Sequence, residues 1–268
     1  MCTTVVLSLL AVMSASGVER RDGLRVHRGK TDPRGEFAFA VLLQRTENPF
    51  SRLCSGSLIA FNWVLTACHC LSESAGPFVI RYGDFTVPAN ETKLYTNVIN
   101  TFIHPNCMAK EFTDSMSLLV LRNDIGLVLV EKVPKKHAKL LAMDYKTLTG
   151  LPTKYAGFGS TSEYFPTDKT RLQTMPLQVG EGVIVSCHLN LMKFNLKLML
   201  IRKGPVVCMT PKCSDRWQGP RAGDSGGPFI YNGRIIGVLS GGIPKIINFF
   251  TPVSVYLEWI KQVMQSNG

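Results

Sequence analysis

The chain has 268 residues, of which 45% are hydrophobic. This composition is sufficient for one large or two small packed domains and excludes an intrinsically disordered protein. The formal net charge of +11 at pH 7 makes the surface attractive to anions. No nucleic-acid-binding motif accompanies the charge, so solvated lysines are the simplest explanation, and acidic glycans or membrane surfaces are the alternative partners. Two cationic clusters stand out, at Lys132, Lys135, Lys136 and Lys139 and at Lys193, Lys197, Arg202 and Lys203.

The N-terminus is typical of a secretory signal. Residues 3–13 form an apolar run that is too short to span a bilayer, and the small residues Ser14-Ala15-Ser16-Gly17 follow it. We expect residues 1–16 to be a signal peptide and the mature protein to be secreted and extracellular. No Lys or Arg precedes the apolar run, and a buried N-terminal strand is the alternative. The later apolar stretch 189–201 is interrupted by lysines, so no membrane span is expected.

Short apolar strands alternate with turns through most of the remaining chain, and little helix is expected before the C-terminus. This pattern predicts an all-β fold of the barrel type. The predicted strands are residues 39–43, 63–65, 79–82, 118–121, 155–156 and 235–239, and residues 254–264 are predicted to form a helix.

A glycine-rich turn near the C-terminus carries the first candidate for chemistry. In the run 221–228, Ser225 lies among glycines that would leave it accessible to a substrate carbonyl. The backbone N–H groups of Gly223 and Ser225 are candidate donors to a developing oxyanion. The same composition also fits an ordinary surface turn. A serine nucleophile needs a base, and His69 is the candidate.

Several segments, in order along the chain, resemble the chymotrypsin family of serine proteases. They are the histidine segment 54–70, Gly157-Phe158-Gly159-Ser160-Thr161, Leu172-Gln173, and the closing strand and helix at 250–260. The resemblance covers the chain from about Val26 to the C-terminus. It implies two antiparallel six-stranded barrels with a C-terminal helix, a protease domain at 26–268 with a barrel boundary near 145, and a site between the barrels.

The resemblance also implies a function. It indicates a serine endopeptidase that acts on protein or peptide substrates, is open to protease inhibitors, and requires neither a cofactor nor a metal. We expect the apolar stripe of Tyr256, Trp259, Ile260 and Val263 to pack on the second barrel.

The cysteines fit an oxidising compartment. Eight are present, and Cys2 would leave with the signal. By resemblance, Cys54 pairs with Cys70 and Cys187 with Cys208. We predict a third bridge between Cys68 and Cys107, with Cys213 left free or paired outside the chain. A zinc site is the competing interpretation of the Cys-His-Cys cluster, but the spacing is not that of a zinc finger or ribbon.

The segment 17–25 is a predicted propeptide. Alignment with the family's N-terminal strand makes Arg25-Val26 the activation bond, and the new amino terminus would pair with Asp224. His27 and Arg28 replace the usual small residues, and a buried arginine without a partner is costly. The Arg20-Arg21 pair is a rival processing site.

The third member of the catalytic triad departs from the family pattern. Counting back from the strand at 118–121 places Ser115 at the acid position and Asp114 one residue too early. Because side chains alternate along a strand, Asp114 would need a bulge to reach His69. Asp114 is the predicted acid, and Ser115 is the alternative partner of His69.

The substrate pocket departs as well. Gly219 occupies the pocket base, so trypsin-like cleavage after basic residues is not expected. The pocket wall reads Ser240-Gly241-Gly242, and Asn248 replaces a glycine that normally keeps the pocket open. The sequence therefore predicts a remodelled pocket. Asn90-Glu91-Thr92 is a glycosylation sequon, which is informative if the chain is secreted.

Two functions follow from these observations. The first is a secreted serine endopeptidase made as a zymogen, with His69 as base, Ser225 as nucleophile and Asp114 as acid. The second is a catalytically impaired protease homologue that acts as a secreted binding or regulatory protein. Retention of His69 and Ser225 favours the first, and the offset acid and altered pocket favour the second.

Overall fold

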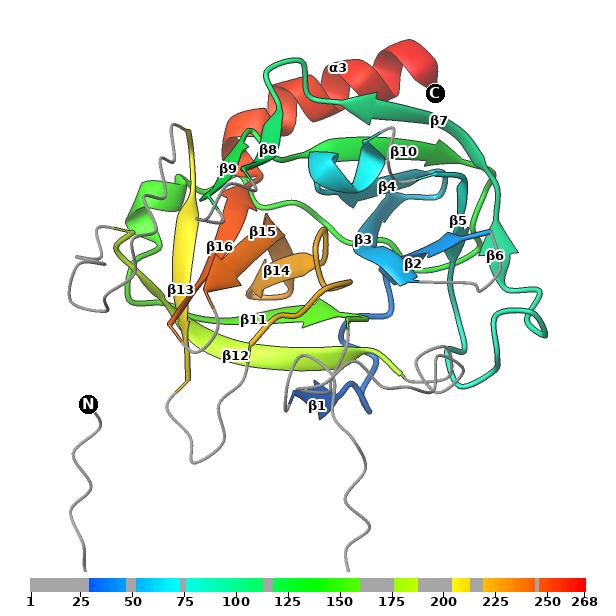
Figure 1. The fold of residues 1–268 in the computed structure, drawn as a ribbon, viewed down its shortest axis with the longest axis horizontal. Coiled ribbons are helices and arrows are strands. Elements are labelled where there is room, and N and C mark those ends of the chain that lie inside the picture. The colour runs from blue at the N-terminus through cyan, green and yellow to red at the C-terminus, as the bar shows by residue number, and fades with distance from the viewer. Residues whose placement is uncertain are drawn as a thin grey trace, which may run out of the picture.

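The computed structural model describes residues 29–46, 52–72, 76–112, 118–159, 176–187, 204–212, 219–243 and 246–268. Within these ranges the fold is mostly β, with two barrel-like sheets and one C-terminal α-helix (Figure 1). The all-β prediction is therefore confirmed. Among the described residues, no helix has both the length and the apolar character needed to cross a membrane.

The first sheet is antiparallel and holds the strands of the N-terminal half, and its central strands are buried along most of their length. Its strand order is β6 (Tyr95–Thr96), β5 (Phe78–Arg81), β2 (Ala40–Arg45), β3 (Arg52–Ala60), β4 (Trp63–Thr66), β10 (Gly126–Val130) and β7 (Val98–Ile103).

The second sheet closes on itself. Its order is β1 (Lys30–Thr31), β12 (Gln178–Val185), β11 (Pro152–Gly157), β14 (Pro228–Tyr231), β15 (Arg234–Ile243), β16 (Ile247–Pro252) and β13 (Val207–Pro211). An additional pairing of β12 with β13 joins the ends, so six strands form a ring and β1 lies outside it against β12. The first strand in the described part of the chain thus pairs with the edge of the second barrel.

One predicted strand has a different place from the one expected. Residues 118–121 were expected to be the barrel strand that follows the catalytic acid. They lie in β9 (Leu118–Arg122), which pairs only with β8 (Met108–Phe112) in a separate two-stranded hairpin. The barrel strand that pairs with β4 is instead β10, which follows later in the chain.

The C-terminal helix corrects a second expectation. A short 3₁₀ turn, η5 (Ser254–Tyr256), leads into α3 (Leu257–Asn267). The rings of Tyr256 and Trp259 each lie 5.1 Å from His104, which follows β7 of the first barrel. These contacts place the helix against the first barrel, because the apolar stripe specifies a buried face but not the sheet that covers it.

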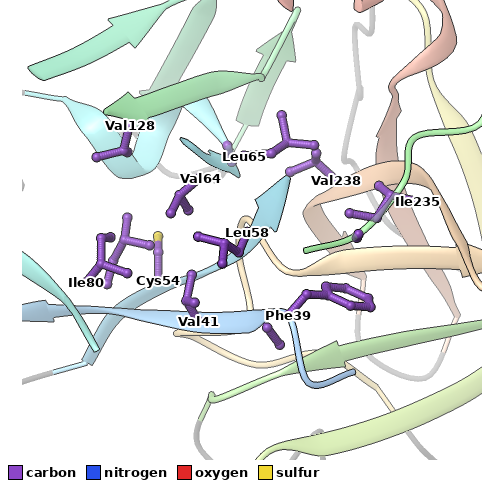
Figure 2. Packing of buried hydrophobic residues seen from close by; sticks show 14 of the residues in the cluster. Phe39, Val41, Cys54, Leu58, Val64, Leu65, Ile80, Val128, Ile235 and Val238 are labelled. Carbon is purple, nitrogen blue, oxygen red and sulfur yellow. The ribbon is translucent and has the colours of Figure 1, made fainter. Parts of the chain in front are cut away.

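The two barrels share a continuous apolar core. Leu58 and Leu65 of the first barrel belong to the same buried cluster as Ile235 and Val238 of the second (Figure 2). A second buried cluster fills the interior of the second barrel, where the ring centroids of Phe229 and Phe250 stack 3.8 Å apart. The junction between the barrels is thus a packed interior, and groups placed on either side of it are held in fixed positions.

Gly226 lies where the loop before β14 crosses the first barrel. Its φ is +79°, and a Cβ at this position would meet Thr66 Oγ1 at 2.1 Å and the Ser55 carbonyl oxygen at 2.3 Å. Gly233, in the β14–β15 turn, has a similar φ of +69° but nothing within 4 Å of its Cβ position. The two glycines separate the cost of backbone conformation from the cost of close packing.

Replacing each glycine with alanine should therefore give different losses of stability. Gly233→Ala should lower the free energy of unfolding by about 1–2 kcal/mol, the cost of a left-handed non-glycine residue. Gly226→Ala should cost more than about 4 kcal/mol, because it adds a clash with backbone at the barrel junction. Urea unfolding of both variants measures the difference, and equal losses would contradict the proposed close approach.

Candidate catalytic site

His69 is held on a 3₁₀ turn, η1 (Cys68–Leu71), that directly follows β4. Disulfides flank it on both sides, because Cys54 is bonded to Cys70 and Cys68 is bonded to Cys107, with Cα–Cα distances of 6.1 and 6.6 Å. Cys68 and Cys70 are buried, whereas 27% of the His69 side chain remains exposed. The turn is thus anchored on both sides, and the imidazole is left accessible.

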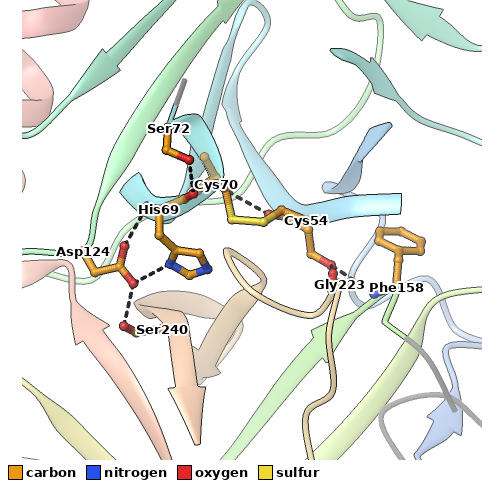
Figure 3. Close-up of a disulfide and its surroundings, with 10 residues drawn as sticks. Cys54, His69, Cys70, Ser72, Asp124, Phe158, Gly223 and Ser240 are labelled. Atoms are coloured by element: carbon orange, nitrogen blue, oxygen red, sulfur yellow. Dashed lines mark hydrogen bonds and ion pairs between the residues drawn. A yellow bond between two sulfur atoms is a disulfide. The ribbon is translucent and has the colours of Figure 1, made fainter. Parts of the chain in front are cut away.

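Asp124 is the carboxylate that holds the imidazole. It lies just before β10 and is only 1% exposed. Its Oδ2 is 2.9 Å from His69 Nδ1, and its Oδ1 accepts the His69 backbone N–H at 3.1 Å. Ser240, on β15 of the second barrel, donates its hydroxyl to the same Oδ2 at 2.6 Å (Figure 3). Three hydrogen bonds therefore fix this carboxylate and, through it, the orientation of the ring.

The two groups shift each other's pKa in opposite directions. Burial acts to lower the pKa of His69, but the charge and hydrogen bond of Asp124 outweigh it, so this pKa lies above its ordinary value. Burial acts to raise the pKa of Asp124, but His69 and the hydrogen bonds from His69 and Ser240 hold it below its ordinary value. A carboxylate accepts only, so Nδ1 carries the proton in this pair and Nε2 has the free lone pair.

This geometry corrects the expectation for the catalytic acid. Asp114 and Ser115 lie outside the described residues, and the Nδ1 position that one of them was expected to fill is occupied by Asp124. The sequence held the signal, because Asp124 directly precedes Ile125-Gly126-Leu127-Val128-Leu129. This is the pattern expected after the acid, with glycine at the place of the small third residue.

The serine loop is tied to the first barrel through Ser55. Ser55 N donates to the carbonyl of Ser225 at 2.7 Å, and its hydroxyl donates to the carbonyl of Gly223 at 2.8 Å. The loop N–H groups of Asp224, Gly226 and Gly227 all have backbone acceptors. Within the described chain, those of Gly223 and Ser225 have none. With the two carbonyls fixed, these two N–H groups remain available to a bound oxygen.

Asp224 is fully buried beneath this loop. Its Oδ1 accepts the N–H of Gly159 at 2.7 Å and its Oδ2 accepts the N–H of Arg221 at 2.8 Å. A Cβ on Gly157 or Gly159 would lie 2.2–2.9 Å from atoms of Asp224 or the backbone near it. The Gly-Phe-Gly motif therefore makes room for a buried carboxylate, a physical reason that sequence comparison alone did not provide.

A cation from the first barrel lies near this carboxylate. Arg52, at the start of β3, donates from Nη1 to the carbonyl of Phe158 at 2.9 Å, and the next residue, Gly159, donates to Asp224. Burial lowers the pKa of Arg52 to about 9, with the charge of Arg81 acting in the same direction and that of Asp224 opposing it. The guanidinium thus keeps its charge at neutral pH. The activation residues Arg25 and Val26 lie outside the described residues.

The pocket residues lie on the second barrel. Asn248 is 2% exposed and pairs directly with Gly242 across β15 and β16. A Cβ on Gly242 would lie 2.8 Å from the side-chain oxygen of Asn248, so the amide covers this part of the strand pair. Gly219 is buried. Ser240, which was predicted to form part of the pocket wall, contacts Asp124.

The remaining predictions concern the other cysteines, the glycosylation sequon and a metal site. Cys187 is bonded to Cys208 with a Cα–Cα distance of 5.3 Å, so all three expected bridges are present. Cys213 lies outside the described residues, and Asn90 is exposed in a turn. Two Cys-rich clusters include His69 or Asp124, but their cysteines are all in disulfides and offer no thiolate to a metal.

The pKa of His69 tests the corrected acid directly. By NMR titration of the ring protons, this pKa should lie above 6.5 in the native protein. In Asp124→Asn it should fall below 6.5, because burial remains while the carboxylate charge is lost. Asp114→Asn is the control and should leave the value unchanged. A drop in the Asp114 variant, or none in the Asp124 variant, would contradict the assignment.

Comparisons with known proteins agree with this geometry. The family described as Trypsin matches residues 26–260. Granzyme M of Rattus norvegicus is 28% identical over 96% of each chain. Human kallikrein-9 is 27% identical over 80% of this chain and 81% of its own, and human kallikrein-8 is 26% identical over 81% and 78%. The chain therefore belongs to the trypsin family, the chymotrypsin-like serine proteases.

Proposed function

We propose that this chain is an active, secreted serine endopeptidase made as a zymogen. Residues 1–16 would direct secretion, and residues 17–25 would be removed by cleavage of the Arg25-Val26 bond. His69, Asp124 and Ser225 would be the catalytic residues, with the N–H groups of Gly223 and Ser225 as the oxyanion hole. The glycan at Asn90 belongs to the same proposal, because the sequon matters only in a secreted chain.

The observation that carries this proposal is the bond between His69 and Asp124. The offset acid was the main argument for an impaired homologue, and a buried carboxylate 2.9 Å from Nδ1 removes it. An oriented and charged partner for the imidazole is worth about four orders of magnitude in turnover. The chain has therefore kept the interaction that a binding protein would not need.

The proposed reaction follows from the proton positions. His69 Nε2 takes the proton from the Ser225 hydroxyl while the oxygen attacks the carbonyl carbon of a peptide bond. Asp124 stabilises the resulting imidazolium. The imidazolium then gives its proton to the leaving amine, and a water molecule hydrolyses the acyl-enzyme by the same steps in reverse.

The oxyanion hole is supported by the hydrogen bonds of the serine loop. Negative charge develops on the substrate carbonyl oxygen, and fixed N–H donors stabilise it without reorganisation. Gly223 and Ser225 supply N–H groups without acceptors among the described residues, while Ser55 holds the intervening backbone in place. A loop fixed in this way favours catalysis over a purely structural role.

Asn248 favours the second candidate function and is the reason to keep it. Its buried amide lies against Gly242, where the family pattern has a glycine that leaves the pocket open. A closed pocket would fit a homologue that binds a partner without cleaving it. The two functions differ in whether Ser225 reacts, which does not require a full substrate pocket.

Labelling with a fluorophosphonate probe separates the two functions. Protein cleaved at Arg25 should react, and Ser225→Ala should abolish labelling. Asp124→Asn should slow labelling by about ten-thousandfold, because the imidazole loses its tautomer and its counter-charge. The rate in native protein should rise with pH through the pKa of His69, above 6.5, since only the neutral ring accepts a proton.

Asp114→Asn is the matched control, and its labelling rate should stay within about twofold of the native rate. Far-ultraviolet circular dichroism of each variant confirms that the fold is intact. Absence of labelling in cleaved and folded native protein would exclude the endopeptidase and leave the binding homologue.

Activation gives a separate prediction. Limited trypsin treatment of the secreted precursor should expose Val26 as the N-terminus and raise the labelling rate. Arg25→Gln should block both effects, whereas Arg21→Gln should block neither. N-terminal sequencing measures the site of cleavage. A fully reactive protein that begins near Asp22 would overturn activation at Arg25.

A further inference from the structure

A groove of about 850 Å³ lies on the second barrel, away from the candidate catalytic residues. The buried side chains of Phe37, Phe39 and Ile230 contribute to its lining. Neither His69, Asp124 nor Ser225 lines it. Its walls come from β11, β12 and the β14–β15 turn, together with the segment 136–139 that connects the barrels.

The charges around this groove are unbalanced. Its two acidic residues are already paired, Glu36 with Lys154 at 2.6 Å and Glu181 with Lys212 at 3.7 Å. Three further cations line the groove, and within the described chain none of them has an acidic partner within 4.0 Å. They are Lys136, Lys139 and Arg234, and all three are exposed.

Two of these cations are neighbours because the backbone segments that carry them pair with each other. Leu140 and Ile235 form a parallel bridge, so Lys139 and Arg234, the residues that precede them, lie side by side. Like charges in such a position repel each other and destabilise the pairing. An anion bound between them would remove this repulsion.

The backbone that carries these cations is fixed. Ala138 N donates to the Leu58 carbonyl at 2.8 Å, and Ile235 N donates to the Lys139 carbonyl at 2.9 Å. The turn Asn232-Gly233 joins Tyr231 to Arg234 with positive φ at both residues, which matches the twist of a tight hairpin. The groove is thus largely preformed, and binding would not require the chain to reorganise.

We propose that this groove binds an acidic peptide segment of a partner protein, one that carries an apolar side chain between carboxylates. The carboxylates would pair with Lys136, Lys139 and Arg234, and the apolar side chain would pack on Phe37 and Ile230. The apolar lining favours a peptide over a sulfated glycan, because sugar sulfates would leave this surface unused. The proposal is independent of catalysis, since the groove contains none of the catalytic residues.

The test measures binding of a fluorescein-labelled peptide, Glu-Glu-Phe-Glu-Glu, by fluorescence anisotropy. All proteins carry Ser225→Ala, so that the peptide is not cleaved. The triple variant Lys136→Gln, Lys139→Gln, Arg234→Gln should bind at least about tenfold more weakly. A peptide with Gly in place of Phe should lose about tenfold as well, and added salt should weaken binding.

The matched control is the triple variant Lys93→Gln, Lys146→Gln, Lys261→Gln. It removes the same charge from three exposed lysines that do not line the groove, and its affinity should stay within about twofold. Thermal unfolding of each variant verifies the fold.

Three results would overturn the proposal. Equal losses in the two triple variants would mean diffuse attraction to a basic surface. Tighter binding of a heparin hexasaccharide that requires the same three cations and excludes the peptide would make this a glycan site. Absence of peptide binding at low salt would also reject it, whatever the outcome of the serine labelling.

Discussion

The buried carboxylate of Asp224 is the constraint on which the arrangement of the site depends. An unpaired charge in a protein interior costs several kcal/mol, so donors and positive charge must be kept beside it. Among the described residues, the N–H groups of Gly159 and Arg221 donate to it, and Arg52 of the first barrel supplies positive charge. The shape of the loop that carries Ser225 therefore depends on stabilising the buried charge of Asp224, and groups from both barrels supply this stabilisation.

The sequence predicted most of the architecture, but it did not predict that Asp124 would be the carboxylate beside His69. The Leu-Leu-Val-Leu run at 118–121 matches the family's strand after the acid, and this match placed the barrel strand there. In the fold these residues form a separate hairpin. The glycine at position 126 weakens the apolar pattern of β10. The fold gives a reason for this glycine, because a Cβ there would lie 2.6 Å from Leu71 Cδ1 and 3.5 Å from the Cα of Cys68. A small residue two positions after Asp124 therefore fits closely beside the turn that carries His69.

The other differences have a common cause, which is that local patterns do not specify long-range partners. The apolar stripe of α3 predicted a buried face, yet it packs on His104 of the first barrel. The Gly-Phe-Gly motif is visible in the sequence, but its physical role is not. The two glycines leave space for Asp224, which lies 65 residues after Gly159 in the sequence and contacts it only in the folded chain. The disulfides were more predictable, because each was expected to join segments that the family fold already places together.

Ser240 connects the carboxylate of the first barrel with the strand pair of the second barrel that carries Asn248. Its hydroxyl holds Asp124 at 2.6 Å, so its strand is fixed relative to the first barrel. Two residues later, the same strand pairs Gly242 with Asn248, whose buried amide lies against that glycine at the predicted pocket. The position of the imidazole depends on contacts between the barrels, whereas the shape of the pocket depends on side chains within one pair of strands. A substitution at Asn248 can therefore change the side chains at the predicted pocket while leaving the hydrogen bonds around Asp124 unchanged.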